Sequence, residues 1–350
     1  MRRSDTFASD VVLSVSLHPS ASVASSAPRS ANDDRIGVLD GWRGLAILLV
    51  LQSHFLPAAG FNSGYLGVSI FFSLSGMLMS EILFVRRVPL ATFYKRRISR
   101  IVPAFLLFVC TVFGIAAWTG LGARGAEFLS TLLFLRTYIP ATPDIWSTDL
   151  PIGHLWSLNV EEHCYIFLSL LTVWAALRGR EAWVLGCAVL AAMVTYYVYL
   201  RSPTMAASPF EIRTETASAF LLASAGYHLV KDRVVGHVRP WMPLLAFAIA
   251  ALAYLPHAHW WEKAVIAPLA LAFAVNHLQQ ASHLLRAALE SLPMRQLGIW
   301  SYSLYLWQQP FYTYKSSLPP GLAFVGAMLA ALLSFYLIER PSREWFNNHW

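Results

Sequence analysis

An arginine and a histidine interrupt the first long apolar segment of the sequence, GVLDGWRGLAILLVLQSHF. Arg43 and His54 are eleven residues apart, which is about 16 Å along a helix at roughly 1.5 Å per residue. Placing an ionisable residue at membrane depth costs roughly 2.5 to 3.5 kcal/mol on insertion scales, so a residue of this kind inside a span indicates a functional role. The pair therefore predicts chemistry that needs reach across a membrane, with Arg43 near one face and His54 near the other.

Two adjacent carboxylates, Glu161 and Glu162, enter a later apolar segment in the run WSLNVEE. Neighbouring residues on a helix point about 100° apart, so only one of the two can face a given partner. We predict that at least one is functional and orients a histidine or an arginine. The alternative is that both are solvated at the interface. The nearby His154 and His163 are more typical of interfacial histidines than of catalysts.

A basic run, FYKRRISRIVP, extends from Phe93 to Pro103 and carries Lys95, Arg96, Arg97 and Arg100. One interpretation is a positive-inside anchor at the cytoplasmic start of a membrane helix. The sharper one is a phosphate clamp, because Arg97 and Arg100 share a helical face and two guanidiniums can hold a diphosphate through charge-assisted bonds.

The composition requires helices that cross a bilayer. The chain has 350 residues, of which 57% are hydrophobic and 13% charged, against about 25% charged in soluble domains. Its mean hydropathy is +0.51. Apolar stretches long enough to cross roughly 30 Å of hydrocarbon predict an all-α, polytopic membrane protein with ten transmembrane helices. The predicted spans are 37–56, 65–85, 101–119, 158–177, 182–200, 212–230, 241–256, 263–281, 297–313 and 321–338.

Basic residues predict the orientation, because Lys and Arg remain in cytoplasmic loops. With the N-terminus inside, 19 of the 26 Lys and Arg residues are cytoplasmic and 6 are outside. Both termini are therefore expected in the cytoplasm. The same excess of basic residues beside the lipid bilayer accounts for the net charge of +7. We therefore expect no nucleic acid as a partner.

Small residues and cysteines add two expectations. Ser73 and Gly76, one turn apart in FFSLSG, favour close approach of two helices, with room for a ligand channel as the alternative. The three cysteines all fall within predicted spans, so we expect no disulfide framework. No spacing of Cys and His typical of zinc is present, and we expect no metal. The cysteines are Cys110, Cys164 and Cys187.

These motifs, in this order, resemble the acyltransferase-3 family of integral membrane O-acyltransferases. The resemblance extends from about residue 36 to 343, which we expect to form one transmembrane domain between a disordered cytoplasmic tail, 1–35, and a short cytoplasmic tail, 344–350. The motifs are Arg43 with His54, FFSLSG, Arg97-Ile98-Ser99-Arg100, WSLNVEE, Tyr302-Ser303-Leu304-Tyr305-Leu306-Trp307 and Ile338-Glu339-Arg340-Pro341.

The resemblance implies a cytoplasmic acyl-CoA donor, which we expect to be acetyl-CoA, and a carbohydrate hydroxyl as acceptor. The acceptor class is a surface polysaccharide, a lipid-linked glycan or a glycosylated metabolite, and the location is the plasma membrane, the inner membrane of a bacterium. Cys164 and Gln308 depart from the residues common in the family, an aromatic and a histidine. We expect that no hydrolase-like domain follows the membrane core and that a second transfer step needs a partner protein.

The expected mechanism joins the motifs. Donor phosphates dock on Lys95, Arg96, Arg97 and Arg100, and the pantetheine arm carries the thioester to His54. His54 is either the general base for the acceptor hydroxyl or the carrier of the acyl group. Glu161 or Glu162 fixes its tautomer, and Arg43 stabilises the donor or developing negative charge.

Outer tryptophans are candidates for acceptor binding. Trp146 and Trp156 flank the longest outer loop, where a sugar ring could stack, although most interfacial tryptophans belong to the aromatic belt. Two other protein classes compete with the enzyme. A secondary transporter should show broken spans at matching positions in two halves, and a non-catalytic scaffold would not need the Arg43, His54 and double-Glu set.

Overall fold

A computed structural model describes residues 31–121, 125–139 and 150–349. Every regular element in these residues is a helix, which confirms the all-α class for this part of the chain. The α-helices are α1 (Ala31–Phe55), α2 (Ser63–Ser80), α3 (Leu90–Thr119), α4 (Gly125–Leu132), α5 (Trp156–Val173), α6 (Glu181–Arg201), α7 (Pro203–Ala206), α8 (Thr214–His228), α9 (Met242–Leu252), α10 (Ala267–Asn276), α11 (His283–Leu289), α12 (Leu292–Thr313), α13 (Pro320–Ser334) and α14 (Arg340–His349).

Shorter helical turns connect these elements. Three of those in the described residues are π-helices that continue an α-helix: η1 (Glu81–Val85), η7 (Glu262–Ile266) and η10 (Phe335–Glu339). A 3₁₀ turn, η2 (Gly153–Leu155), leads directly into α5, and another, η4 (Phe210–Ile212), precedes α8. The final helix α14 includes most of the segment predicted as a tail, residues 344–350.

Each predicted span coincides with a helix, but the helices differ in whether their length and hydropathy allow them to cross a membrane. Within the described residues, four helical stretches are long and apolar enough to cross a membrane: Ser63–Val85, Leu90–Thr119, Glu181–Arg201 and Gly321–His349. Helices such as α8, with 15 residues, are shorter, and α8 is buried along most of its length. A helix surrounded by protein does not need a lipid-compatible face. The number of ten crossings and the cytoplasmic termini therefore stay predictions.

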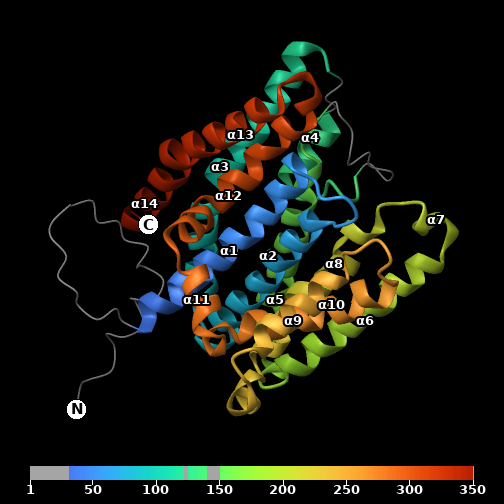
Figure 1. Cartoon of the computed structure of the whole chain (residues 1–350), viewed down its shortest axis with the longest axis vertical. Coiled ribbons are helices and arrows are strands. Elements are labelled where there is room, and N and C mark those ends of the chain that lie inside the picture. Colours follow the sequence, from blue (N-terminus) through green and yellow to red (C-terminus); the bar gives the residue numbers. More distant parts are fainter. Residues whose placement is uncertain (1–30, 122–124, 140–149, 350) are drawn as a thin grey trace.

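Helix α1 lies at the centre of the bundle, against α12 and α2 (Figure 1). Helix α2 packs in turn on α8, α8 on α6 and α10, and α13 on α12. Glycines permit the closest crossings: a Cβ at Gly298 of α12 would lie 1.8 Å from the carbonyl oxygen of Asp40 in α1. A Cβ at Gly76 would lie 2.0 Å from the carbonyl oxygen of Leu221 in α8, which confirms the packing interpretation of Gly76.

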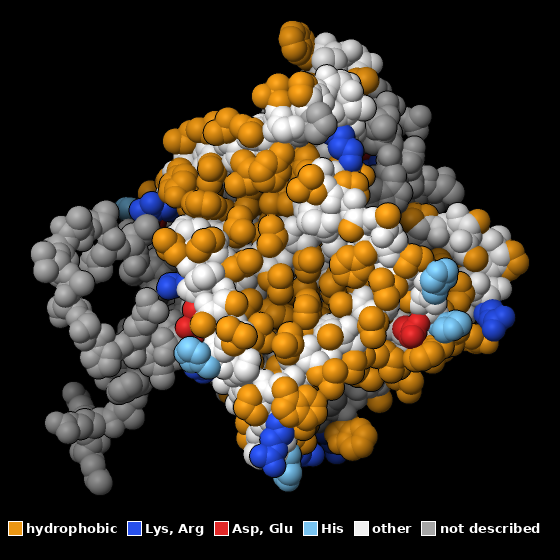
Figure 2. Space-filling model, viewed as in Figure 1, with side chains coloured by type: hydrophobic (Ala, Val, Ile, Leu, Met, Phe, Trp, Pro, Cys, Tyr) orange, Lys and Arg blue, Asp and Glu red, His pale blue; other side chains and the backbone are white. Residues whose placement is uncertain are grey.

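The surface is that of a protein in lipid. Figure 2 shows a face on which hydrophobic side chains extend over many helices, with charged side chains gathered toward its margins. Trp183 on α6 is 80% exposed, and Leu190, Val194 and Val198 on the same helix are exposed as well. Contiguous apolar surface of this kind marks contact with membrane or protein. With the apolar helices, it makes the chain a multi-pass membrane protein.

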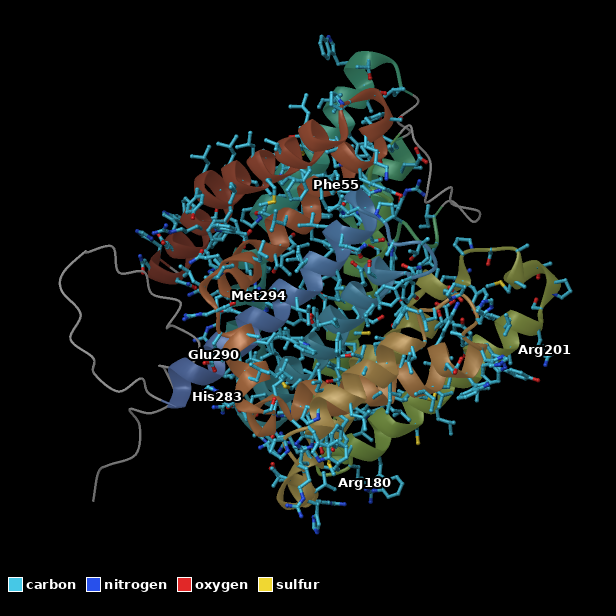
Figure 3. The ribbon with its side chains drawn as sticks, viewed as in Figure 1. Phe55, Arg180, Arg201, His283, Glu290 and Met294 are labelled. Carbon is cyan, nitrogen blue, oxygen red and sulfur yellow. The ribbon has the colours of Figure 1, made fainter. Side chains whose placement is uncertain are left out.

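The two ends of α1 define the two ends of the molecule. Figure 3 shows Glu290 and Met294 beside the first half of α1 and Phe55 at its far end. Arg180 and Arg201 lie at opposite ends of α6. We call the end that holds His54 and Phe55 the His54 end.

Candidate active site

A cavity of about 320 Å³ lies between α1, α2, α3, α5, α12 and α14. Cationic side chains line one part of it and apolar or aromatic side chains most of the rest. The cationic set is Arg43, Arg96, Arg97, Arg100 and Arg343, and the apolar and aromatic set includes Phe71, Phe72, Leu74, Leu78, Met79, Ile82, Phe93, Ile101, Leu158, Tyr302 and Tyr305.

The cationic part, which we call the basic end, combines three helices. Arg43 of α1 forms an ion pair with Asp40, 2.7 Å from Nη1 to Oδ1. The charges of Arg43, Arg100 and Arg343 act on one another. In the described part of the chain, neither Arg100 nor Arg343 forms an ion pair within 4 Å. Like charges gathered in one cavity favour the binding of an anion.

The sequence did not single out Arg343. It lies on α14, far along the chain from the basic run, and α14 packs against α3. Lys95, a predicted donor residue, is not among the residues that line the cavity. It precedes Arg100 by five residues on α3, a spacing that places the two residues on different faces of a helix with about 3.6 residues per turn. In the folded protein the basic end therefore contains Arg343 from α14 and lacks Lys95 from the basic run on α3.

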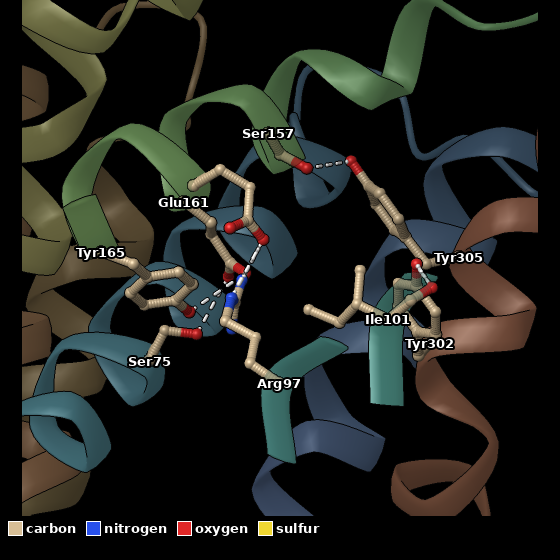
Figure 4. A network of polar contacts seen from close by, with 9 residues as sticks. Ser75, Arg97, Ile101, Ser157, Glu161, Tyr165, Tyr302 and Tyr305 are labelled. Carbon is tan, nitrogen blue, oxygen red and sulfur yellow. Dashed lines mark hydrogen bonds and ion pairs between the residues drawn. The ribbon is translucent and has the colours of Figure 1, made fainter. Parts of the chain in front are cut away.

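Arg97 is held by carboxylates. Its Nη2 lies 2.6 Å from Oε1 of Glu162 and 3.6 Å from Oε2 of Glu161, and its Nε donates to Glu162 at 3.0 Å. The guanidinium stacks on the ring of Tyr165, 3.5 Å from its centroid. Figure 4 shows this network, in which Ser75 also donates to Glu161 at 2.9 Å. The arginine is therefore already neutralised.

This network changes the roles expected for three residues. Glu161 and Glu162 orient an arginine, one of the two alternatives that the sequence left open, and their partner is Arg97. The expectation that one of them fixes the tautomer of His54 does not hold in the structure. The expectation that Arg97 and Arg100 act as an equal pair fails for a physical reason. Two carboxylates form ion pairs with Arg97, whereas within the described residues Arg100 forms no ion pair and is attracted by Glu339 only at longer range.

At the other part of the cavity, Ser157 and Tyr305 bond to each other, 2.7 Å apart (Figure 4). The Tyr305 hydroxyl donates to the carbonyl oxygen of His154 at 2.7 Å. The His154 ring is buried between the rings of Phe108 and Tyr305, so His154 is a core residue rather than an interfacial one. His163 bonds to Thr214 Oγ1 at 2.7 Å.

His54 ends α1 beside α12. Its Nδ1 and Oε1 of Gln308 are hydrogen bonded, and its ring stacks on Tyr312 with centroids 4.1 Å apart. Lys315 Nζ donates to the His54 carbonyl oxygen at 2.7 Å. An amide oxygen only accepts, so it holds the proton on Nδ1 and leaves the Nε2 lone pair free. Gln308 lies one helical turn after Tyr305, which lines the cavity.

Sequence analysis identified Gln308 only as a departure from the family's histidine and gave it no role in the site. A glutamine after a Leu-Trp pair indicates no function by itself, and its hydrogen bond to His54 is found only where α12 packs on α1. Between Arg43 and His54, α1 is an unbroken helix, so their separation of about 16 Å holds. Arg43 is too far from His54 to stabilise charge on a group that reacts there.

Of the two tryptophans predicted to bind the acceptor, the structure describes one. Trp146 lies outside the described residues. Trp156 is 5% exposed and packs its ring against Tyr65 and Phe72, at centroid distances of 5.6 and 5.7 Å. A ring buried on both sides offers no face to a sugar, so the stacking role for Trp156 is wrong.

The site also agrees with a match to known proteins. The profile of a family described as an acyltransferase domain matches residues 36–340, most of the chain. The chain belongs to this acyltransferase family. Its family motifs converge in space: Arg43, FFSLSG, the Arg97–Arg100 run, WSLNVEE and YSLYLW all contribute residues that line the cavity. Glu339 of the last motif is buried and accepts from Ser303 at 2.6 Å.

Named relatives of this acyltransferase chain are longer. YrhL of Bacillus subtilis is 28% identical over 87% of this chain and 54% of its own length. O-acetyltransferase OatA of Staphylococcus aureus is 24% identical over 87% of this chain and 57% of its own. Peptidoglycan O-acetyltransferase OatA of Listeria monocytogenes is 25% identical over 87% and 55%. The chain thus spans about half the length of these relatives. No solved structure matches it significantly.

Proposed function

We propose that this chain is a membrane O-acyltransferase that moves an acetyl group from cytoplasmic acetyl-CoA to a hydroxyl of a carbohydrate. The names of the relatives point to acetyl as the group and to a peptidoglycan-type glycan as the acceptor. The observation that carries the proposal is the cavity, which runs from a cluster of arginines past apolar walls to Tyr305, one turn from the residue that holds His54.

The donor binds at the basic end. The charges of Arg100 and Arg343 act on each other, and within the described residues neither guanidinium forms an ion pair within 4 Å. They are therefore the best ligands for the diphosphate of CoA. Arg96 and Arg43 add charge at the same end, and the pair with Asp40 keeps Arg43 in place. The apolar stretch lined by Phe71, Leu78 and other residues then surrounds the pantetheine arm.

The transfer takes place at His54. The acceptor oxygen attacks the thioester carbonyl carbon while Nε2 of His54 takes the hydroxyl proton. The carbon–sulfur bond then breaks, and CoA leaves as the thiol with the proton that His54 returns. Gln308 keeps the Nε2 atom unprotonated before the attack. In the second route, Nε2 itself attacks the thioester and carries the acetyl group, which the acceptor hydroxyl then removes.

The test is transfer of radiolabelled acetyl from acetyl-CoA to glycan fragments by the full chain in lipid nanodiscs. We expect His54→Ala to lower the rate by about 10² to 10⁴, the usual contribution of a general base, with unchanged melting behaviour. His237→Ala, at an exposed histidine in a 3₁₀ turn, is the matched control and should retain full activity.

Two outcomes would refute the proposed reaction, and a third would refute only the role of His54. Wild-type protein that neither transfers nor hydrolyses acetyl-CoA would exclude the reaction, and uptake of a solute without acyl transfer would favour the transporter. Near-normal transfer by a folded His54→Ala variant would leave the reaction possible and remove His54 from it.

A further inference from the structure

Glu339 is a buried carboxylate beside the basic end. It is 1% exposed and is the last residue of the π-helix η10, through which α13 continues into α14 (Figure 1). Both η10 and α14 pack on α3, which carries Arg100. The charges of Arg100 and Arg343 act on Glu339. The proposed transfer reaction does not use this carboxylate.

The spacing of Glu339 and Arg343 is that of an ordinary helical ion pair. The two residues are four apart, the separation at which acidic and basic side chains on a helix meet. The neighbouring Arg340 and Glu344 do form such a pair, with 3.0 Å between Nε and Oε1. In the described residues, however, Glu339 forms no ion pair within 4 Å.

A serine on a third helix holds the carboxylate away from the arginine. The Ser303 hydroxyl on α12 donates to Oε2 of Glu339 at 2.6 Å, and both residues are buried. A buried carboxylate needs such a donor because water does not solvate it there. The hydrogen bond therefore fixes Glu339 toward α12, and its charge acts on Arg100 and Arg343 only over a longer distance.

This distance matters for the binding of an anion. A guanidinium has five N–H donors in a fixed fork, and a carboxylate in contact with it occupies some of them, as Glu162 does at Arg97. Glu339 instead offsets the repulsion between Arg100 and Arg343 through space and leaves their N–H groups to bond phosphate. Its negative charge also opposes bound phosphates, which favours the release of CoA.

We propose that Glu339 is a positioning residue that keeps Arg100 and Arg343 open for phosphate, and that Ser303 holds it in its distant position. The inference rests on the proposed function, because it takes the phosphates of CoA as the ligand of the basic end. Removal of the carboxylate and removal of its hydrogen-bond donor should then change the affinity for CoA in opposite directions. A purely structural role of both residues would weaken CoA binding in both variants.

The experiment measures CoA binding directly, without acceptor, by isothermal titration calorimetry on the full chain in nanodiscs. We expect Glu339→Gln to bind CoA at least about threefold more tightly, because one like charge leaves a cavity that screens charges less than water does. Ser303→Ala should bind CoA at least about threefold more weakly, because the freed carboxylate can pair with Arg343 and occupy its N–H groups. Glu181→Gln, at the partly exposed start of α6 and outside the cavity lining, is the control and should match the wild type.

A double variant separates the effect of the charge from misfolding. Ser303→Ala should not change CoA affinity in the Glu339→Gln background, because no carboxylate is left to move. Melting curves identify the variants that fold. Ser303→Ala removes a single hydroxyl, so its weaker CoA binding tests the inference even where Glu339→Gln is unstable.

Two results would overturn the inference. One is weaker or unchanged CoA binding by folded Glu339→Gln, and the other is unchanged or tighter binding by Ser303→Ala. Acetyl transfer to glycan fragments, measured in parallel, tests the proposed function separately. Opposite shifts in CoA affinity without any transfer would retain the role of Glu339 and refute the reaction, whereas transfer without the opposite shifts would do the reverse. A wild type that does not bind CoA would overturn both.

Discussion

Arg97 and Arg100 share a helical face but should respond differently to substitution. Arg97 is the buried partner of Glu162 at 2.6 Å and of Glu161 at 3.6 Å, with side-chain exposures of 13%, 17% and 15%. Arg97→Gln would leave two buried carboxylates without their cation. Removing one partner of a buried ion pair costs about 3 to 5 kcal/mol, so we expect a large loss of stability.

Arg100→Gln is the matched comparison. Arg100 lines the cavity and has no ion pair in the described residues, so its removal leaves no closely paired carboxylate without its cation. The change relieves repulsion with Arg43 and Arg343 and loses a longer-range attraction to Glu339, so we expect little change in the stability of the fold. We expect a higher KM for acetyl-CoA with an unchanged melting temperature. The assay is thermal unfolding of the purified variants in detergent, followed by transfer kinetics over a range of acetyl-CoA concentrations.

A double variant tests the cause of the instability. Arg97→Gln combined with Glu162→Gln removes both charges of the closer pair, so it should recover much of the stability that Arg97→Gln loses. Non-additivity of this kind is the signature of a direct interaction. The reasoning is refuted if Arg97→Gln melts like the wild type and raises the KM for acetyl-CoA as much as Arg100→Gln does.

Three further predictions follow from the helix packing. Gln308→Leu should lower kcat on the order of tenfold, the lower end of what a partner that orients a histidine contributes, with the KM for acetyl-CoA unchanged. Gly298→Ala should destabilise the protein by about 1 to 3 kcal/mol or more, because the new Cβ would lie 1.8 Å from the carbonyl oxygen of Asp40. Ala59→Cys should react with an impermeant thiol reagent added outside cells, and Ala91→Cys only after the membrane is breached. The labelling background is a variant that lacks Cys110, Cys164 and Cys187.

Each of these has a control. Gln308→His should retain activity, because an imidazole nitrogen can accept the same hydrogen bond, and an unimpaired Gln308→Leu would dismiss the tautomer argument. Gly114→Ala, where a new Cβ meets nothing within 4 Å, should not destabilise the fold, so an equal response to Gly298→Ala would contradict the crossing. The reverse labelling pattern would place His54 beside the cytoplasm.

The sequence predicted the helices well, because the length and spacing of apolar residues are local properties. The segments around 65–85 and 182–200 became α2 with η1, and α6, within a few residues. It also predicted the packing of Gly76, since a small residue in an apolar helix has few other uses. The prediction that a sugar ring stacks on Trp156 was wrong, because whether a tryptophan at the start of a helix faces outward or inward depends on what packs over it.

Composition and ordered motifs are readable along the chain, so they were enough to predict the class of the protein, its family and the ionisable residues that interrupt its apolar segments. The partners of those residues became known from the packing of the helices: Glu161 and Glu162 with Arg97, Gln308 with His54, and Arg343 beside Arg100. The state of a charge or a tautomer depends on the group across the helix interface. That group lies on another helix, at a sequence separation that no local pattern encodes.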